Sequence, residues 1–148
     1  MQESTETIDD ETVVVVTTPA ASPPLQVWDV LVSRTAEWWG APYLGIDGGA
    51  MRLEPQLGGR VYCGNDPEFG ELHGTIRAFD PPERLEIGGV LVPGAYTGNI
   101  TITVAKTNLG SEIRVEQSAR GRIEVTVEER MSHGWTTMLH KLAELADR

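Results

Sequence analysis

The chain has 148 residues, a formal net charge of −10 and one cysteine. Its length predicts one domain with a substantial core. The acidic excess excludes nucleic-acid binding, because phosphate affinity comes mainly from Lys and Arg. It also disfavours docking on an anionic membrane. The lone cysteine rules out an internal disulfide.

Residues 1–11 form a polar, acidic segment with one isolated apolar residue, Ile8. Such a segment cannot bury enough apolar surface to offset its ordering entropy, so we predict a disordered tail before a single domain of residues 12–148. We find no secretory signal and no apolar run long enough to span a membrane, and we therefore expect a cytoplasmic protein. The domain opens with a β-branched strand, Thr12 to Thr18.

Two short helices follow this strand. Ser22 is expected as the N-cap of the first, with prolines in its first turn and apolar residues at helical spacing in "LQVWDVLV". The second, in "RTAEWWG", ends at Gly40 before a glycine-rich loop. Adjacent Trp38 and Trp39 cannot both point inward from one helix, so we expect one of them at a pocket or its rim.

From Met51 the hydrophobic period changes to two, which predicts β-strands. The alternating stretches are "MRLEPQL", "RVYCG", "ELHGTIRAF", "RLEIGGV", "NITITVAKT" and "SEIRVEQSA". Short turns between them imply an antiparallel meander with one buried face. Gly58 and Gly59 form a hairpin corner in this interpretation, because a phosphate loop needs a helix after it and a strand follows here.

The chain ends in a helix with one broad apolar stripe. Its members are Val127, Met131, Gly134, Trp135, Met138, Leu142 and Leu145. A sheet with one apolar face needs a cover, and this helix is the only long apolar one in the sequence. The predicted fold class is α+β: a curved antiparallel sheet of about seven strands, one before and six after the two short helices, wrapped around the C-terminal helix. A cavity can remain where sheet and helix stand apart.

Five stretches in this order carry a resemblance to a known family. They are "SPPLQVWDVLV", "EWW", "EPQLGGRVY", "HGTIRAFDPPERLEI" and "HGWTTMLHKLAEL". Together they resemble the START-like (SRPBCC) superfamily, with its helix-grip fold, and within it the AHSA-type group related to activators of the heat-shock-protein-90 ATPase. The resemblance covers about Thr12 to Leu145.

The resemblance implies a fold with a cavity and leaves the function open. Members of the superfamily include lipid and hormone carriers, polyketide cyclases and aromatases, plant allergens that bind hydrophobic ligands, and co-chaperone domains; fold alone cannot choose among them. We expect binding of a small hydrophobic ligand, aromatic or polyketide-like. The alternative is a cyclase-, aromatase- or hydrolase-type enzyme that uses the same cavity. A co-chaperone-like interaction domain is less favoured, because the eukaryotic co-chaperones carry a further N-terminal domain that this chain lacks.

The sequence offers no convincing catalytic or metal-binding cluster. Three scattered histidines and one cysteine give no zinc constellation, so we expect no metal and no cofactor. By alternation, His73 lies with Glu71 on the face opposite Leu72 and Ile76. A nucleophilic Cys63 is therefore not expected, and a small core residue is the better interpretation. A homodimer is left open.

Gln117 continues the inward series of Ile113 and Val115, which places an amide on an apolar face. A buried amide without partners costs about 1–3 kcal/mol, so we consider either a strand end with backbone bonding or a polar anchor that orients a ligand. Many relatives carry His near this place, and the departure weakens an acid–base role here. The predicted ligand-binding residues are Trp38, Trp39, Leu53, Val61, Cys63, Leu72, Ile76, Ile87, Ile102, Gln117, Met131 and Trp135.

Overall fold

A computed structural model of the chain describes residues 7–39, 51–66, 69–92, 96–124 and 126–148. The first six residues of the expected tail and the expected glycine-rich loop before Met51 lie outside the described residues.

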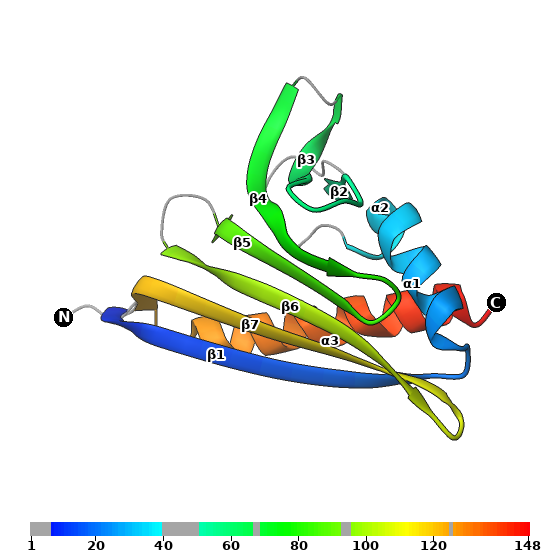
Figure 1. Cartoon of the computed structure of the whole chain (residues 1–148). Helices are drawn as coiled ribbons and strands as arrows, with labels where there is room; N and C mark the ends of the chain where they lie inside the picture. Colours follow the sequence, from blue (N-terminus) through cyan, green and yellow to red (C-terminus); the bar gives the residue numbers. More distant parts are fainter. Residues whose placement is uncertain (1–6, 40–50, 67–68, 93–95, 125) are drawn as a thin grey trace.

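The described strands form one seven-stranded antiparallel sheet in the order β1-β7-β6-β5-β4-β3-β2. They are β1 (Thr7–Ala20), β2 (Met51–Leu53), β3 (Arg60–Asp66), β4 (Phe69–Asp80), β5 (Arg84–Val92), β6 (Tyr96–Thr107) and β7 (Gly110–Glu124). The helices are α1 (Pro24–Ser33), α2 (Thr35–Trp38) and α3 (Val127–Ala146). Helix α3 lies across one face of the sheet along β1 and β7, while the far ends of β3 and β4 rise away from those strands (Figure 1). The predicted α+β helix-grip fold is confirmed.

Strand β1 begins earlier than predicted. Thr7 pairs with Glu124, and the ladder continues to Ala20, which pairs with Ser111. The expectation of a disordered tail is therefore wrong for residues 7–11. The ladder is built from backbone hydrogen bonds, which the long partner strand β7 supplies whatever side chains the segment carries.

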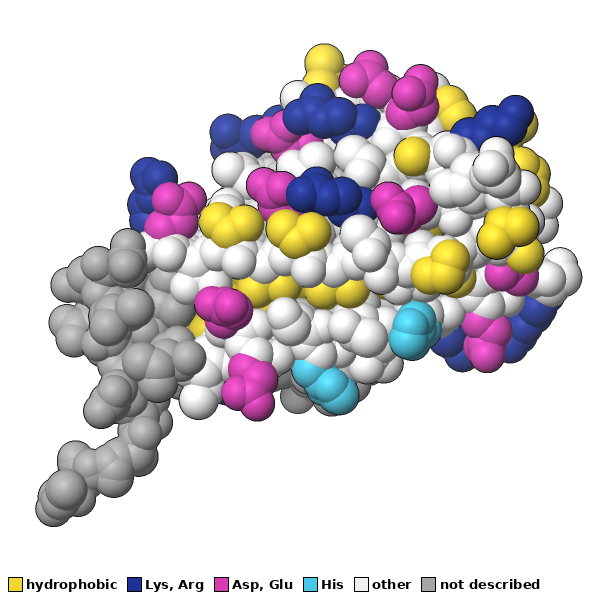
Figure 2. Space-filling model, turned by 90° about the horizontal axis from the view of Figure 1, so that it is seen from below, with side chains coloured by type: hydrophobic (Ala, Val, Ile, Leu, Met, Phe, Trp, Pro, Cys, Tyr) yellow, Lys and Arg dark blue, Asp and Glu magenta, His cyan; other side chains and the backbone are white. Residues whose placement is uncertain are grey.

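Strand β1 is also an outer strand of the sheet, so among the described residues one of its edges has no neighbour. Val13 and Val15, on its outer face, are 50% and 48% exposed. Seen from below, the molecule shows apolar side chains along its middle, with charged side chains and histidines around them (Figure 2). The unpaired backbone edge of such a strand can pair with a strand of a second chain. The homodimer that the sequence leaves open therefore remains an untested expectation.

The start of α1 is tied to the end of α3. Helix α1 begins one residue later than expected and Pro23 is its N-cap, so the prediction that Ser22 caps it is wrong. The Ser22 hydroxyl donates to the carbonyl oxygen of Ala146 at 2.7 Å and lies 2.6 Å from Asp147 Oδ1. The Asp147 carboxylate also accepts from the backbone N–H groups of Ala21 and Ser22, each at 3.0 Å. These bonds clamp two segments that are distant in the sequence.

The main core lies between the inner face of the sheet and the helices. Helix α3 buries one stripe at steps of three and four residues, as predicted. Each large apolar side chain buried there contributes roughly 1.5–3 kcal/mol. The buried residues of α3 are Val127, Gly134, Trp135, Met138, Leu139, Leu142, Ala143, Leu145 and Ala146.

The segment between β2 and β3, "EPQLGG", forms the predicted hairpin corner. The two strands pair with Leu53 opposite Val61. The Glu54 carboxylate accepts from the backbone N–H of Arg60 at 2.8 Å and from its Nη2 at 2.7 Å, and these bonds lower the pKa of Glu54 to about 2. Gly58 has a φ of +81°, in the left-handed region that favours glycine. The paired glycines thus serve the turn.

We expect Gly59→Ala to destabilise the protein by about 1–3 kcal/mol, the usual cost of forcing an extra methyl into a packed site. An added Cβ would overlap the carbonyl oxygen of Glu54 and lie 2.9 Å from that of Gln56, and neither backbone atom moves easily. Urea unfolding of the variant measures the loss.

The matched control is Gly58→Asn, because no atom lies within 4 Å of a Cβ at this position and Asn tolerates positive φ. We expect it to cost less than about 1 kcal/mol. Equal stabilities for Gly59→Ala and the wild type would contradict this account of the corner.

The Asp147 clamp predicts an acid-dependent loss of stability. Partial burial alone would raise the pKa of Asp147, but the hydrogen bonds from Ser22 and Ala21 outweigh it and lower the pKa below its ordinary value. A lowered folded-state pKa gives stability that is present above the unfolded pKa and lost as pH falls through the folded one. We expect Asp147→Asn to cost about 1 kcal/mol at pH 7, and the difference from wild type to shrink below about pH 4. Urea unfolding across pH 2–7 tests this; a constant difference would refute it.

Candidate functional site

The inner face of the sheet carries a layer of branched side chains that ends in an amide. Ile76 pairs with Ile87, Ile87 with Ile100, and Ile100 with Gln117. All four are buried, and they come from β4, β5, β6 and β7 in turn. Because paired residues share a face, they define the side that faces α3.

The next row along the same face carries almost no side chain. Gly89 pairs with Gly98 and Gly98 with Ala119, while a Cβ on Gly89 would lie 2.8 Å from the Cα of Gly74. We call Gly74, Gly89, Gly98 and Ala119 the small-residue strip. Glycines also let a sheet bend, and Gly89 has a φ of +147° beside a register shift. The strip therefore places no side chain larger than a methyl group on the inner face of four adjacent strands.

Three tryptophans pack together against this interior. Trp39 lies 5.4 Å from Trp38 and 5.3 Å from Trp135 between ring centroids. Both Trp38 and Trp39 are buried, so the expectation that only one could point inward is wrong. Helix α2 ends at Trp38, and Trp39 has an extended backbone (φ −103°, ψ 94°), which releases the pair from helical spacing. The indole N–H of Trp38 donates to the carbonyl oxygen of Leu31 at 3.1 Å.

Gln117 is buried, as its place in the alternation predicts. Its Oε1 accepts a hydrogen bond of 2.6 Å from the indole Nε1 of Trp135, so the partner is a side chain of α3 rather than the backbone. An amide also has two N–H donors, and within the described residues no hydrogen bond from them is found. The pair joins the sheet to α3 and keeps donor capacity in the interior.

A β-bulge reverses the expected facing of part of β4. Val61 pairs with Gly74, but Tyr62 pairs with Leu72, so His73 is the extra residue. Leu72 is consequently 55% exposed, so the expectation that it faces the core with Ile76 is wrong. His73 is 4% exposed, which corrects the expectation that it faces away from the core.

The bulge brings His73, Glu71 and Cys63 to one face. Cys63 pairs with Glu71, and His73 Nε2 lies 3.3 Å from Glu71 Oε1, without the geometry of a hydrogen bond. Burial, and then the negative charge of Glu71, raise the pKa of the Cys63 thiol. A raised pKa disfavours the thiolate, so this group is a poor nucleophile although its histidine is on the same face.

Most predicted site residues meet in the main core cluster, while Met131 packs elsewhere. It is half-buried against Ala119 and Val127, a small cluster separate from the main core. Ala119 is itself part of the small-residue strip. Predicted residues inside the main cluster are Trp38, Trp39, Leu53, Val61, Cys63, Ile76, Ile87, Ile102 and Trp135.

Sequence reasoning missed the small-residue strip. The glycines were visible in "HGTI", "IGGV" and "TGNI". Only the register between strands shows that they align.

The described part of the chain holds no group of three or more His, Cys, Asp or Glu residues that could hold a metal ion. None of its helices is long and apolar enough to cross a bilayer.

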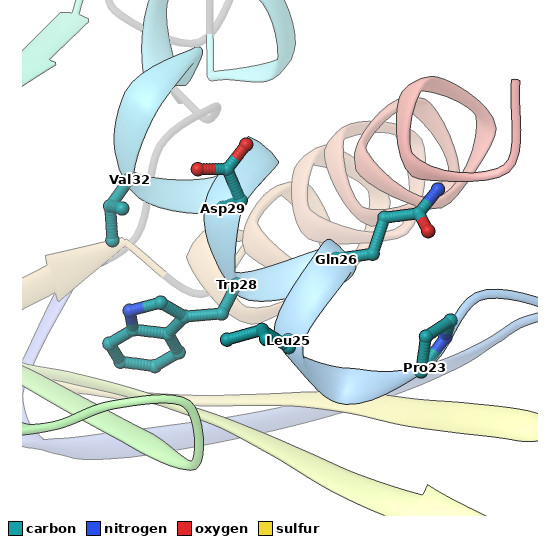
Figure 3. Close-up of a pocket in the computed structure, with 6 residues that line it drawn as sticks. All are labelled: Pro23, Leu25, Gln26, Trp28, Asp29 and Val32. Atoms are coloured by element: carbon teal, nitrogen blue, oxygen red, sulfur yellow. The ribbon is translucent and has the colours of Figure 1, made fainter.

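A hollow of about 430 Å³ lies on the surface of α1 (Figure 3). Its lining residues are Pro23, Leu25, Gln26, Trp28, Asp29 and Val32. Helix α1 follows the end of β1 at Ala20, whereas Ala119 of the strip pairs with Thr12. The hollow is thus a separate, open surface feature, and Trp28 beneath it packs on Phe79 with ring centroids 5.7 Å apart.

Comparison with known proteins agrees with this architecture. A family model described as activator of Hsp90 ATPase homolog 1-like protein matches residues 21–147. None of the curated proteins compared with the sequence matches it.

Solved structures share the fold at low identity. MLL2253 from Mesorhizobium loti has a TM-score of 0.71 at 23% identity, over 93% of this chain and 98% of that one. CalU16 from Micromonospora echinospora has a TM-score of 0.68 at 16% identity, over 97% of this chain and 87% of that one. DynU16 is described as a putative protein in the dynemicin biosynthetic locus. It has a TM-score of 0.64 at 17% identity, over 89% of this chain and 46% of that one. Identities this low show the fold alone.

We expect Trp135→Phe to lower the free energy of unfolding by about 1–3 kcal/mol, because it leaves the buried Gln117 oxygen without a donor. Adding Gln117→Leu should recover part of the loss, since an apolar side chain needs no partner. Urea unfolding of the two single variants and the double variant measures the coupling. Strictly additive losses would show that the bond contributes nothing.

Proposed function

The chain belongs to the activator of Hsp90 ATPase homolog 1-like family of the START-like superfamily, and on this fold we propose that it binds a small hydrophobic ligand, aromatic or polyketide-like. The ligand would lie between the inner face of the sheet and α3. One observation carries the proposal: the small-residue strip next to the Trp135–Gln117 pair.

The strip supports the proposal because it places no side chain larger than a methyl group on the inner face of four adjacent strands. The layer beside it is fully apolar except for Gln117. Pockets for small molecules are mostly apolar with a few placed polar groups, and this combination fits that description. Trp39 and Trp135 add aromatic surfaces, which favours a flat or aromatic ligand over a flexible acyl chain.

The likeness to DynU16 points in the same direction, since that protein is described as belonging to a biosynthetic locus. An enzyme in the same cavity would need a nucleophile or base. Among the described residues the nearest arrangement to one is Cys63, His73 and Glu71, and the raised pKa of the thiol counts against nucleophilic catalysis there. Binding is therefore the function that the geometry supports best.

The test uses N-phenyl-1-naphthylamine, a neutral apolar dye, so that the net charge of −10 does not oppose its binding. We expect the wild type to bind it with energy transfer from tryptophan to the dye. Ala119→Leu, which puts a bulky side chain on the strip, should weaken the affinity at least about tenfold, or about 1.4 kcal/mol. Near-ultraviolet circular dichroism confirms that the variant keeps its packing.

The matched control is Ala105→Leu, the same chemical change at an exposed position of β6. It should leave the affinity within about twofold of wild type. No dye binding by the wild type, or equal weakening by both variants, would refute the proposed site. Native mass spectrometry of the freshly purified protein can identify a ligand that stays bound.

A further inference from the structure

The two outer strands of the sheet differ in how they are protected against pairing with another chain. Natural sheets shorten, bulge or charge their outer strands to prevent unwanted pairing. Strand β2 has only three residues, so its length protects it. Strand β1 pairs with β7 from Thr7 to Ala20 without a register shift, and among the described strands none lies on its other side (Figure 1). The long open edge of β1 therefore has neither a bulge nor a short length to protect it.

The middle of β1 also lacks protective charges. From Thr12 to Thr18 the sequence is "TVVVVTT", which contains no charged residue and no proline. Val13 and Val15 are about half exposed on the outer face. β-branched residues of this kind favour strand pairing. An edge with this composition is suited to accept a further strand.

Pro19 shows which backbone groups of β1 point to the open edge. A proline within a ladder lies where its missing N–H would face away from the neighbouring strand. Pro19 pairs with Glu112 of β7, so its nitrogen is on the open side. Backbone groups alternate between the two sides of a strand with a period of two. The residues that share the direction of Pro19, all with exposed side chains, are Glu11, Val13, Val15 and Thr17.

We propose that β1 pairs with β1 of a second copy of this chain, antiparallel, about a two-fold axis at Val14. The two sheets then form one continuous sheet across the interface. Val13 lies opposite Val15 of the partner subunit, and each exchanges backbone hydrogen bonds with the other. The axis makes the contact self-complementary, because the same residues are used by both copies.

Charge selects this register and makes a second copy a suitable partner. Glu11 is the charged residue of β1 closest in sequence to Val14, and Arg120 of its own chain lies 3.5 Å from it. In the proposed register Glu11 lies opposite Thr17 of the partner subunit. The two Glu11 residues are then six positions apart along the ladder, or ~20 Å, well beyond the Debye length of ~8 Å at physiological salt.

Neighbouring registers are less favourable. A shift towards the N-terminus of β1 would bring the two Glu11 carboxylates closer together. A shift towards the C-terminus would set Glu11 opposite Pro19 of the partner subunit, and a proline cannot donate to the ladder.

The first test is sedimentation of the full chain across the micromolar range. A contact of one strand per subunit is small, so we expect a reversible dimer with a micromolar Kd. Val15→Lys should raise that Kd at least about tenfold, because lysine on an outer strand opposes pairing. The matched control is Leu72→Lys, at a similarly exposed residue of β4, and it should stay within about twofold of wild type. Both changes add one positive charge, so a change in net charge cannot explain a difference between them.

Cysteine pairs test the register. The native Cys63 is buried and is the only cysteine of the chain. Residues that exchange hydrogen bonds across a ladder have Cα atoms about 5.5 Å apart, within the range of a disulfide. A mixture of Val13→Cys and Val15→Cys should therefore cross-link faster on mild oxidation than either variant alone. Faster cross-linking of one variant with itself would refute the register.

Hydrogen exchange of the wild type decides the matter if Val15→Lys does not fold. The amides of Val13, Val15 and Thr17 should become protected as the protein concentration rises. Those of Val14 and Val16, which point to β7, should be protected at every concentration.

Two results would overturn the dimer. One is a wild type that stays monomeric at high micromolar concentration without added protection of these amides; the open edge would then be free or reserved for a different chain. The other is a dimer that Val15→Lys and Leu72→Lys weaken equally. Neither result would affect the proposed ligand site, which lies on the inner face of the sheet.

Discussion

The antiparallel register of β4 to β7 decides what the interior of this protein contains. Because side chains alternate between faces, a shift of one residue in any one of these strands would turn that strand's member of the layer to the outer face. In the observed register Ile76, Ile87 and Ile100 meet Gln117 in one row. The same pairing sets Gly98 opposite both Gly89 and Ala119 in the next row. A filled layer and a bare strip thus lie side by side as two consequences of one register.

Helix α3 has a different task at each of its ends. Near its C-terminus, Ala146 and Asp147 bind the Ser22 segment and fix the helix against α1. Toward its N-terminus, Val127 packs on Ala119 in a small cluster apart from the main core, where the opposing strand residues are smallest. Trp135 stands between the two regions and is bonded to Gln117. The helix is therefore held firmly where the core is full and is joined to the sheet by a polar bond beside the strip.

Local patterns predicted the elements well, because each strand and helix shows its own period. They failed where a neighbouring segment sets the geometry. His73 is buried because β3 imposes a bulge, which an alternation count through "ELHGTI" cannot see. Trp39 turns inward because α2 ends one residue earlier than its helical pattern suggests. Residues 7–11 form a strand because β7 extends far enough to pair with them. Gln117 could be placed inward from alternation alone, but its partner on α3 depends on how the helix lies across the sheet.

The electrostatics of the proposed site would favour recognition of a neutral molecule over chemistry on a charged one. The chain carries a net charge of −10, and Glu71 places one carboxylate 3.3 Å from the histidine that borders the strip. Burial and the same carboxylate keep the Cys63 thiol protonated, which removes the obvious nucleophile. What remains near the strip are aromatic faces, an amide and an imidazole, and each of these binds neutral groups without bringing an unpaired charge into the interior. A site of this kind gains most of its affinity from apolar area and its selectivity from one or two hydrogen bonds.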